Sequence, residues 1–204
     1  RNASDAQAMV DTAEAAHQEV QSMLLRMREV AVQAVNGTLN SADRTALNTE
    51  MTALETEITK IADNTTFGGI NLGTSGVVVF QVGPAKGTTI THTFADFDAA
   101  SLSLSGGVDT ATNAANAISL IDDAISLVST RRGELGALSN RLTSTIANLD
   151  NIAVNLSSAR GRIEDADFAK ETSNLAKSQI MQQAATAMLA QANASKQTVL
   201  ALIQ

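Results

Sequence analysis

The residues best suited to chemistry are few and scattered along the chain. His92 is followed by Asp96 and Asp98, and one imidazole with two carboxylates could bind a metal ion or support a hydrolase or carbohydrate-binding site. All three residues lie in a segment rich in Gly, Ser and Thr, which does not fix ligands in place. The preferred interpretation of His92 is therefore a solvated strand residue.

The other candidates lack the partners that their chemistry requires. His17 is the only other histidine and falls among polar positions of a helical pattern. The absence of Cys excludes disulfides and thiolate metal sites. Gly68-Gly69 lacks the lysine of a phosphate-binding loop, and Asp165 and Asp167 lack the spacing of a calcium loop. We expect no catalytic, cofactor-binding or metal-binding residue, and no enzyme.

The composition is typical of packed helices rather than of a core filled with aromatic rings. The chain has 204 residues, of which 44% are hydrophobic and 2% aromatic, and its single proline is Pro84. The net charge of −7 disfavours binding to the phosphates of nucleic acid or to an anionic membrane surface. No apolar run is long enough to span a bilayer. We therefore expect no nucleic-acid partner and no membrane insertion.

Three long segments have apolar residues at alternating steps of three and four, which is the repeat of a coiled-coil seam. In residues 5–35 the seam consists of Met9, Ala13, Ala16, Val20, Met23, Met27, Val30 and Ala34. In residues 41–63 it consists of Leu47, Met51, Leu54, Ile58 and Ile61. In residues 110–163 it consists of Ile118, Ile121, Ile125, Val128, Leu135, Leu142, Ile146, Leu149, Ala153 and Leu156. Arg132 and Ser139 interrupt the third seam.

These helices must cover one another. A helix of about 50 residues is about 75 Å long and cannot bury its seam alone. The short loop after the first helix favours an antiparallel pair with the second, although a second helix that continues past a kink is an alternative. The predicted fold class is mainly α, an elongated antiparallel coiled-coil bundle of long helices with a small β-hairpin region.

The middle and the end of the chain have different compositions. Residues 77–82 and 88–94 predict the two strands of a β-hairpin around the turn 83–87. Residues 95–108 predict a loop, with an extra strand near 101–105 as an alternative. A last helix, residues 168–202, carries an apolar stripe with no matching helix in the chain, so its partner must be missing sequence or another molecule. Its apolar residues include Leu175, Ile180, Met181, Ala184, Met188, Leu189, Ala192, Val199, Leu200 and Ile203.

Five segments resemble bacterial flagellin. They are residues 1–5 (RNASD), 25–33 (LRMREVAVQ), 64–72 (NTTFGGINL), 155–168 (NLSSARGRIEDADF) and 191–204 (QANASKQTVLALIQ). The resemblance implies a subunit that self-assembles into the extracellular flagellar filament for swimming motility. A hook–filament junction protein of the same family is the alternative.

The resemblance also implies a division of the chain. Residues 1–72 and 110–163 would be rod-domain helices, 73–109 a reduced variable region, and 164–204 the filament-core helix. The sequence would lack roughly the first 60 residues of the family, including the helix that pairs with the filament-core helix. The expected partners are further copies of the chain, a flagellin-specific export chaperone that binds the C-terminal helix, and flagellar cap and junction proteins. Export would use the flagellar type III apparatus.

The family is also recognised by an animal innate receptor. The motif match places Arg26, Val30 and Glu50 at the receptor-contacting positions, which the filament would cover between subunits. Val30 replaces the usual leucine, and the lost methylene is worth about 0.8 kcal/mol of apolar burial at most. The resemblance therefore implies weakened rather than abolished recognition.

Overall fold

The computed structural model describes residues 1–74, 76–164 and 168–201, with side chains described up to residue 196. The elements are α1 (Asn2–Val35), α2 (Ser41–Asn64), β1 (Thr66–Phe67), β2 (Ile70–Asn71), β3 (Gly76–Gln81), β4 (Thr89–Phe94), α3 (Ala111–Glu164) and α4 (Phe168–Ala201). Residues 1–150 form one compact unit, and residues 151–204 form a second. The predicted fold class is confirmed.

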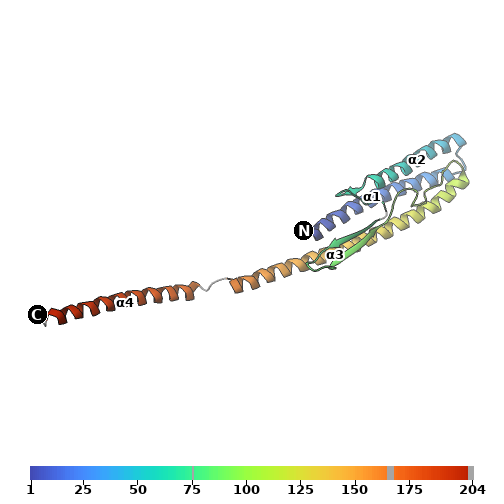
Figure 1. Cartoon of the computed structure of the whole chain (residues 1–204). Coiled ribbons are helices and arrows are strands. Elements are labelled where there is room, and N and C mark those ends of the chain that lie inside the picture. The colour runs from blue at the N-terminus through green and yellow to red at the C-terminus, as the bar shows by residue number, and fades with distance from the viewer. Residues whose placement is uncertain (75, 165–167, 202–204) are drawn as a thin grey trace. The chain divides into compact units, whose positions relative to one another are not determined.

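In the first unit, α1 and α2 form an antiparallel pair (Figure 1), so the alternative of one kinked helix is wrong. The side chain of Asn40 accepts a hydrogen bond from the Asp43 amide, and the Asp43 carboxylate accepts one from the Asn40 amide, which caps the start of α2. The Arg44 guanidinium then fixes the turn by donating to three carbonyl oxygens, those of Ala34, Asn36 and Leu39.

A row of four polar residues joins α1 to α3. They are spaced seven residues apart, which places them on one face of the helix. This polar row consists of Gln7, Glu14, Gln21 and Arg28. Gln7 donates to Ser139 over 2.7 Å, Glu14 and Gln21 both accept from Arg132, and Arg28 pairs with Asp122 at 2.6 Å. The two residues that interrupt the seam of α3 are therefore among the partners of this row, and α1 runs antiparallel to α3.

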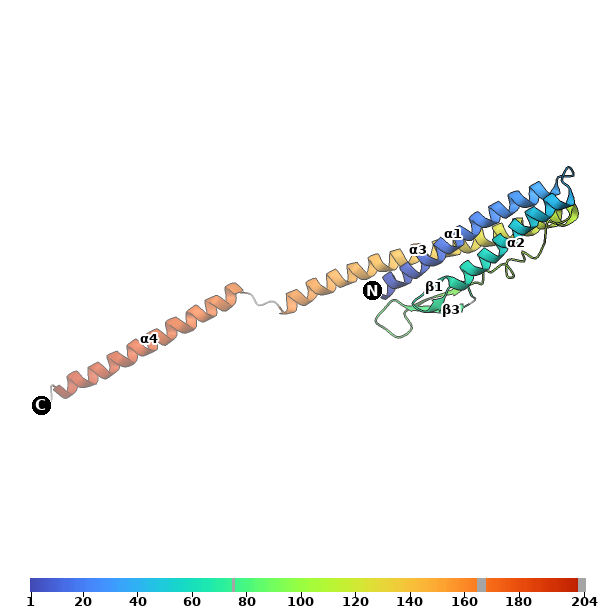
Figure 2. The same ribbon diagram turned by 90° about the horizontal axis from the view of Figure 1, so that it is seen from above.

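The core lies where α1 meets both other helices, and Figure 2 shows the three helices alongside one another. Besides the predicted seam, a second heptad row of α1 is buried: Ala3, Val10, His17, Leu24 and Ala31. One apolar cluster joins α1, α2 and α3, and another joins the start of α1 to the hairpin and to residues 135–142 of α3. A helix that contacts neighbours on two sides needs a wider buried arc than a single seam provides.

The predicted hairpin is confirmed, with β3 and β4 paired antiparallel in the register Val78↔His92. Its inner face places Phe80, Ile90 and Phe94 in the second cluster. A smaller hairpin of β1 and β2 turns at Gly68 and Gly69, whose φ values of 58° and 84° are the reason for glycine there.

Residues 95–110, here called the strap, return from β4 to α3 across the bundle. Residues 99–103 form turns, and residues 104–105 are irregular, so the alternative strand near 101–105 is wrong. The strap places four apolar side chains in the first cluster: Phe97, Leu102, Leu104 and Val108. Its backbone is fixed at one end by Phe97, whose amide donates to the Gly73 carbonyl, and at the other by Val108, whose amide donates to the Asn48 side chain.

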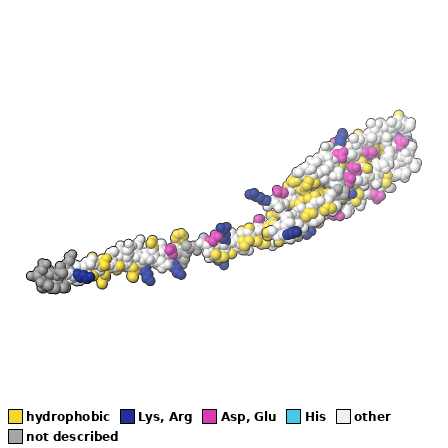
Figure 3. All heavy atoms as spheres, in the orientation of Figure 1, with side chains coloured by type: hydrophobic (Ala, Val, Ile, Leu, Met, Phe, Trp, Pro, Cys, Tyr) yellow, Lys and Arg dark blue, Asp and Glu magenta, His cyan; other side chains and the backbone are white. Residues whose placement is uncertain are grey.

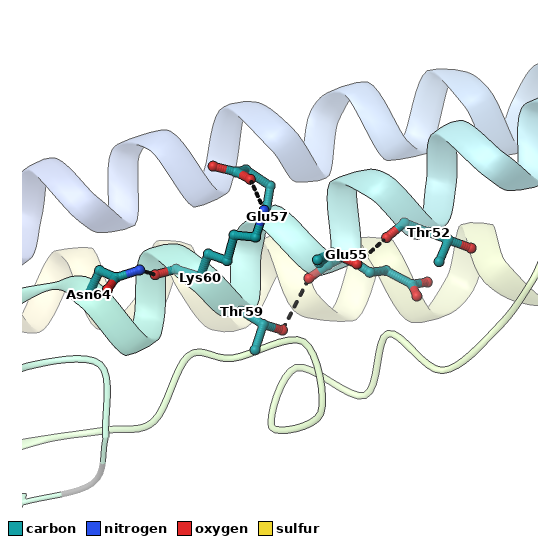
Figure 4. Close-up of polar contacts among 7 residues, drawn as sticks. Thr52, Glu55, Glu57, Thr59, Lys60 and Asn64 are labelled. Atoms are coloured by element: carbon teal, nitrogen blue, oxygen red, sulfur yellow. Dashed lines mark hydrogen bonds and ion pairs between the residues drawn. The ribbon is translucent and has the colours of Figure 1, made fainter.

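The other side of α2 is polar. Figure 4 shows Thr59 donating to the Glu55 carbonyl and Lys60 paired with Glu57 at 3.4 Å. Hydroxyl groups that bond within their own helix, together with exposed ion pairs, leave this face satisfied by itself and by water.

Candidate functional site

The last part of α3 leaves its apolar residues more exposed than the first part does. Gln7, near the start of α1, already bonds to Ser139, so α1 covers little of α3 beyond this level. Leu142 is buried, Ile146 and Leu149 are half-buried, and Leu156 is exposed. The prediction that the seams satisfy one another as far as residue 163 is therefore wrong beyond Leu142, because α1 begins at Asn2 and supplies no side chains farther along.

The second unit leaves its large apolar side chains exposed, with Ile163 at 85% and Phe168 at 80% of their full exposure. Figure 3 shows hydrophobic side chains at several places along α4. We call this set the apolar surface: Ile152, Val154, Leu156, Ile163, Phe168, Leu175, Ile180, Met181, Met188 and Leu189. A surface of this extent indicates a site of protein–protein contact.

The sequence explains why α4 is a helix without covering its apolar residues. It has 34 residues with no Gly or Pro, and it is rich in Ala, Gln, Leu and Met, which favour helix. Only four of its residues carry charge: Lys170, Glu171, Lys177 and Lys196. In the described part of the chain, no helix combines the length and apolar character that a membrane span requires.

The apolar residues of α4 are distributed around the helix. Ile180 and Leu189 are nine positions apart and so lie about 180° apart around the axis, whereas Met181 and Met188 lie on nearly the same side. The expectation of a single stripe is therefore wrong. A helix that is apolar on all sides is typical of one that several neighbours enclose.

The structure describes five of the eight residues expected to form the filament-core and chaperone-binding helix. Leu175, Ile180, Met181, Met188 and Leu189 are all exposed on α4, between 58% and 71%. The side chains of Val199 and Leu200, and all of Ile203, lie outside the described residues.

Of the three residues expected to contact a receptor, the structure brings two together. Arg26 on α1 pairs with Glu50 on α2 at 2.7 Å and with Glu29 at 3.0 Å, in the open on the α1–α2 face. These hydrogen bonds, first that with Glu50, raise the pKa of Arg26. Val30 is instead 1% exposed within the first core cluster. The assignment of Val30 to a receptor surface conflicts with this burial, which its place in the predicted seam already indicated.

The histidines are placed differently from the expectation. His17 is not at a polar position: it is 3% exposed, and burial lowers its pKa. His92 is half-buried in β4 with its ring edge-on to Phe94, and burial lowers its pKa as well. Within the described ranges no three His, Asp or Glu residues are grouped as a metal would require, so His92, Asp96 and Asp98 do not form a site.

Both ends of the chain match one protein family. Residues 1–73 match the bacterial flagellin N-terminal helical region, and residues 118–203 match the bacterial flagellin C-terminal helical region. Flagellin from Halalkalibacterium halodurans is 43% identical over 209 residues, which cover 100% of this chain and 77% of that protein. This chain belongs to the bacterial flagellin family.

Other flagellins agree. Flagellin FlaB1 from Treponema pallidum is 33% identical, with 100% of this chain and 78% of that protein covered. The crystal structure of Bacillus cereus flagellin has a TM-score of 0.67 at 31% identity and covers 78% of this chain and 94% of that one. A putative flagellar hook-associated protein from Vibrio parahaemolyticus has a TM-score of 0.64 at 17% identity, which shows a shared fold only.

Flagellin is the structural subunit of the extracellular flagellar filament, and it is not an enzyme. The predictions of filament function, location and self-assembly are thereby confirmed. The N-terminal family match begins at residue 1 and gives no support to the expectation that roughly 60 residues precede Arg1.

Proposed function

We propose that this flagellin extends filaments through its apolar surface, which becomes enclosed by helices of neighbouring copies. The observation that carries the proposal is the exposure of apolar side chains on opposite sides of α4, such as Ile180 at 64% and Leu189 at 65%. In this proposal residues 164–204 are the filament-core helix, residues 1–72 and 110–163 are rod helices, and residues 73–109 are a reduced variable region. The exposed end of α3 is a second part of the contact.

The test places charge at the centre of this surface. The double variant Met188→Glu, Leu189→Glu should fail to extend filaments from preformed seeds, because an enclosed carboxylate without a partner is costly. The matched control Met188→Leu, Leu189→Met changes the same two positions but keeps them apolar, and it should extend filaments normally. Filament length by electron microscopy is the readout, and filaments of ordinary length from the Met188/Leu189 variant would refute the proposal.

Before assembly, the same surface needs a temporary cover. We propose that the flagellin-specific export chaperone binds α4 until the chain passes through the type III apparatus, and that cap and junction proteins contact it in the flagellum. Exposed apolar area of this extent favours a bound partner. Calorimetric titration should show chaperone binding to the whole chain and not to one that ends at Glu164. Equal affinity for both chains would contradict this assignment.

The exposed Arg26–Glu50 pair fits a different partner. We propose that an animal innate receptor contacts Arg26 and Glu50, while Val30 affects recognition only through the core. Arg26→Ala should lower receptor signalling severalfold. Arg28→Ala is the control, because it removes a similarly exposed ion pair on the α3 side of α1. An equal loss for both variants would argue against a specific contact.

A further inference from the structure

Two histidines from distant parts of the sequence line one small cavity beside the strap. His17 comes from α1 and His92 from β4, and Ala95, the first residue of the strap, also lines the cavity. Arg131 and Glu134 of α3 complete the charged lining. The filament function uses none of these groups.

The His17 ring is buried and contacts both the backbone of α1 and the strap. Its Nδ1 atom lies 2.8 Å from the Ala13 carbonyl oxygen, so Nδ1 carries the hydrogen and donates it. The ring centroid lies 4.4 Å from that of Phe97, which is the first fully buried side chain of the strap. His17 therefore contacts the side chain by which the strap enters the core.

Arg131 places a permanent positive charge beside the cavity. The Arg131 guanidinium donates to the carbonyl of Asp96, next to Phe97. Burial is the main cause that lowers the pKa of His17; Arg131 and Arg132 also lower it, while the bond to Ala13 and the charge of Glu14 raise it. Burial likewise lowers the pKa of His92, against an opposing effect of Glu134. A proton on either ring adds positive charge beside Arg131 in a poorly hydrated site.

We propose that His17 is an acid-sensitive latch: as a neutral ring it holds Phe97 and the start of the strap against α1, and its protonation releases them. Since this flagellin belongs to an extracellular filament, the latch couples the order of the strap to the pH of the surrounding medium.

The sign of the effect follows from the lowered pKa of His17. Its contribution to strap closure is complete above the ordinary value of 6.5 and is lost as the pH falls below it. Glu55, beside Leu104 at the far part of the strap, acts in the opposite sense because burial raises its pKa. Its contribution is complete below the ordinary value of 4.5 and is lost as the pH rises through the raised pKa, so a loss of protection on acidification has the sign expected of His17 and not of Glu55.

Hydrogen exchange of the whole chain, read by mass spectrometry at pH 7.5, 6.5 and 5.5, tests the latch. Protection factors, taken relative to the unfolded chain at each pH, should fall in residues 95–104 by up to about tenfold per pH unit below 6.5 for one linked proton. The α1–α2 turn, residues 36–40, is the internal control and should not change. His17→Gln should remove most of this pH dependence, and His92→Gln should remove less.

A second measurement keeps the test decisive if His17→Gln does not fold. The ring signals of His17 in the unaltered chain, followed by NMR, should titrate below pH 6.5 together with the Phe97 signals. Unchanged protection of residues 95–104 down to pH 5.5 would overturn the latch, as would titration of His17 at or above its ordinary pKa.

Discussion

The two units of this flagellin differ in the exposure of their large apolar side chains, which the first unit mostly buries and the second leaves exposed. In residues 1–150, Val20, Leu24 and Met27 are at most 1% exposed, whereas in residues 151–204 Leu175, Met188 and Leu189 are more than half exposed. Both regions are long helices built from Ala, Leu, Ile, Val and Met. The difference lies in whether the chain supplies a helix to cover them. One unit covers most of its apolar side chains by itself, and in our proposal neighbouring copies cover those of the other.

The largest expected difference between the units comes from replacing one leucine in each by alanine and comparing the free energies of unfolding. Leu24→Ala should lower the free energy of unfolding by about 2–5 kcal/mol, because it leaves a cavity between packed helices. Leu189→Ala should change it by less than about 0.5 kcal/mol. Urea denaturation of the monomer, followed by circular dichroism, measures both. Equal losses would mean that α4 is already covered in the monomer.

Removing an ion pair should cost more free energy of unfolding in the first unit than in the second, although both losses are smaller than that of Leu24→Ala. Arg132→Ala should cost about 1–2 kcal/mol, because Glu14 and Gln21 both lose a donor at a site only one-third exposed. Arg160→Ala removes a pair with Glu164 at the surface of α3 and should cost no more than about 0.5 kcal/mol. The same denaturation experiment distinguishes them, and a negligible loss for Arg132→Ala would show that the polar row contributes little stability.

The smallest expected change is an increase in the free energy of unfolding, from a substitution at Gly133. Gly133 lies inside α3, is exposed, and has open space where a Cβ atom would be. Gly133→Ala should raise the free energy of unfolding by about 0.5–1 kcal/mol by favouring the helix. Thermal unfolding measures it, with filament growth as a check that assembly is unchanged. A loss of stability would indicate that residue 133 needs backbone freedom.

Much of the fold is predictable from the sequence because apolar residues recur at regular spacings in its helices and strands. The heptad steps located all three long helices of the first unit, and alternation located β3 and β4. The length of the seam in α3 does not predict how much of it is buried, since burial depends on the level at which α1 begins. That level is set by contacts such as Gln7 with Ser139, which no local pattern specifies.

The candidate sites show the same limit. A single seam predicts a polar position for His17. His17 nevertheless lies seven residues from both Val10 and Leu24, and this second heptad row predicts its burial. Val30 was correctly included in the seam and also assigned to a receptor surface by resemblance. The two assignments conflict, and packing decides between them. The apolar residues on opposite sides of α4 could be read from spacing alone.

The polar row of α1 has a mechanical consequence. A seam of Ala, Val and Met alone would tolerate a slip of one heptad, about 10.5 Å, with similar packing. A slip in one direction would bring Arg28 toward Arg132, and a slip in the other would leave Asp122 facing Gln21 instead of Arg28. The polar row therefore favours a single register between α1 and α3. A filament made of such subunits can bear tension and torque without α1 and α3 sliding along each other.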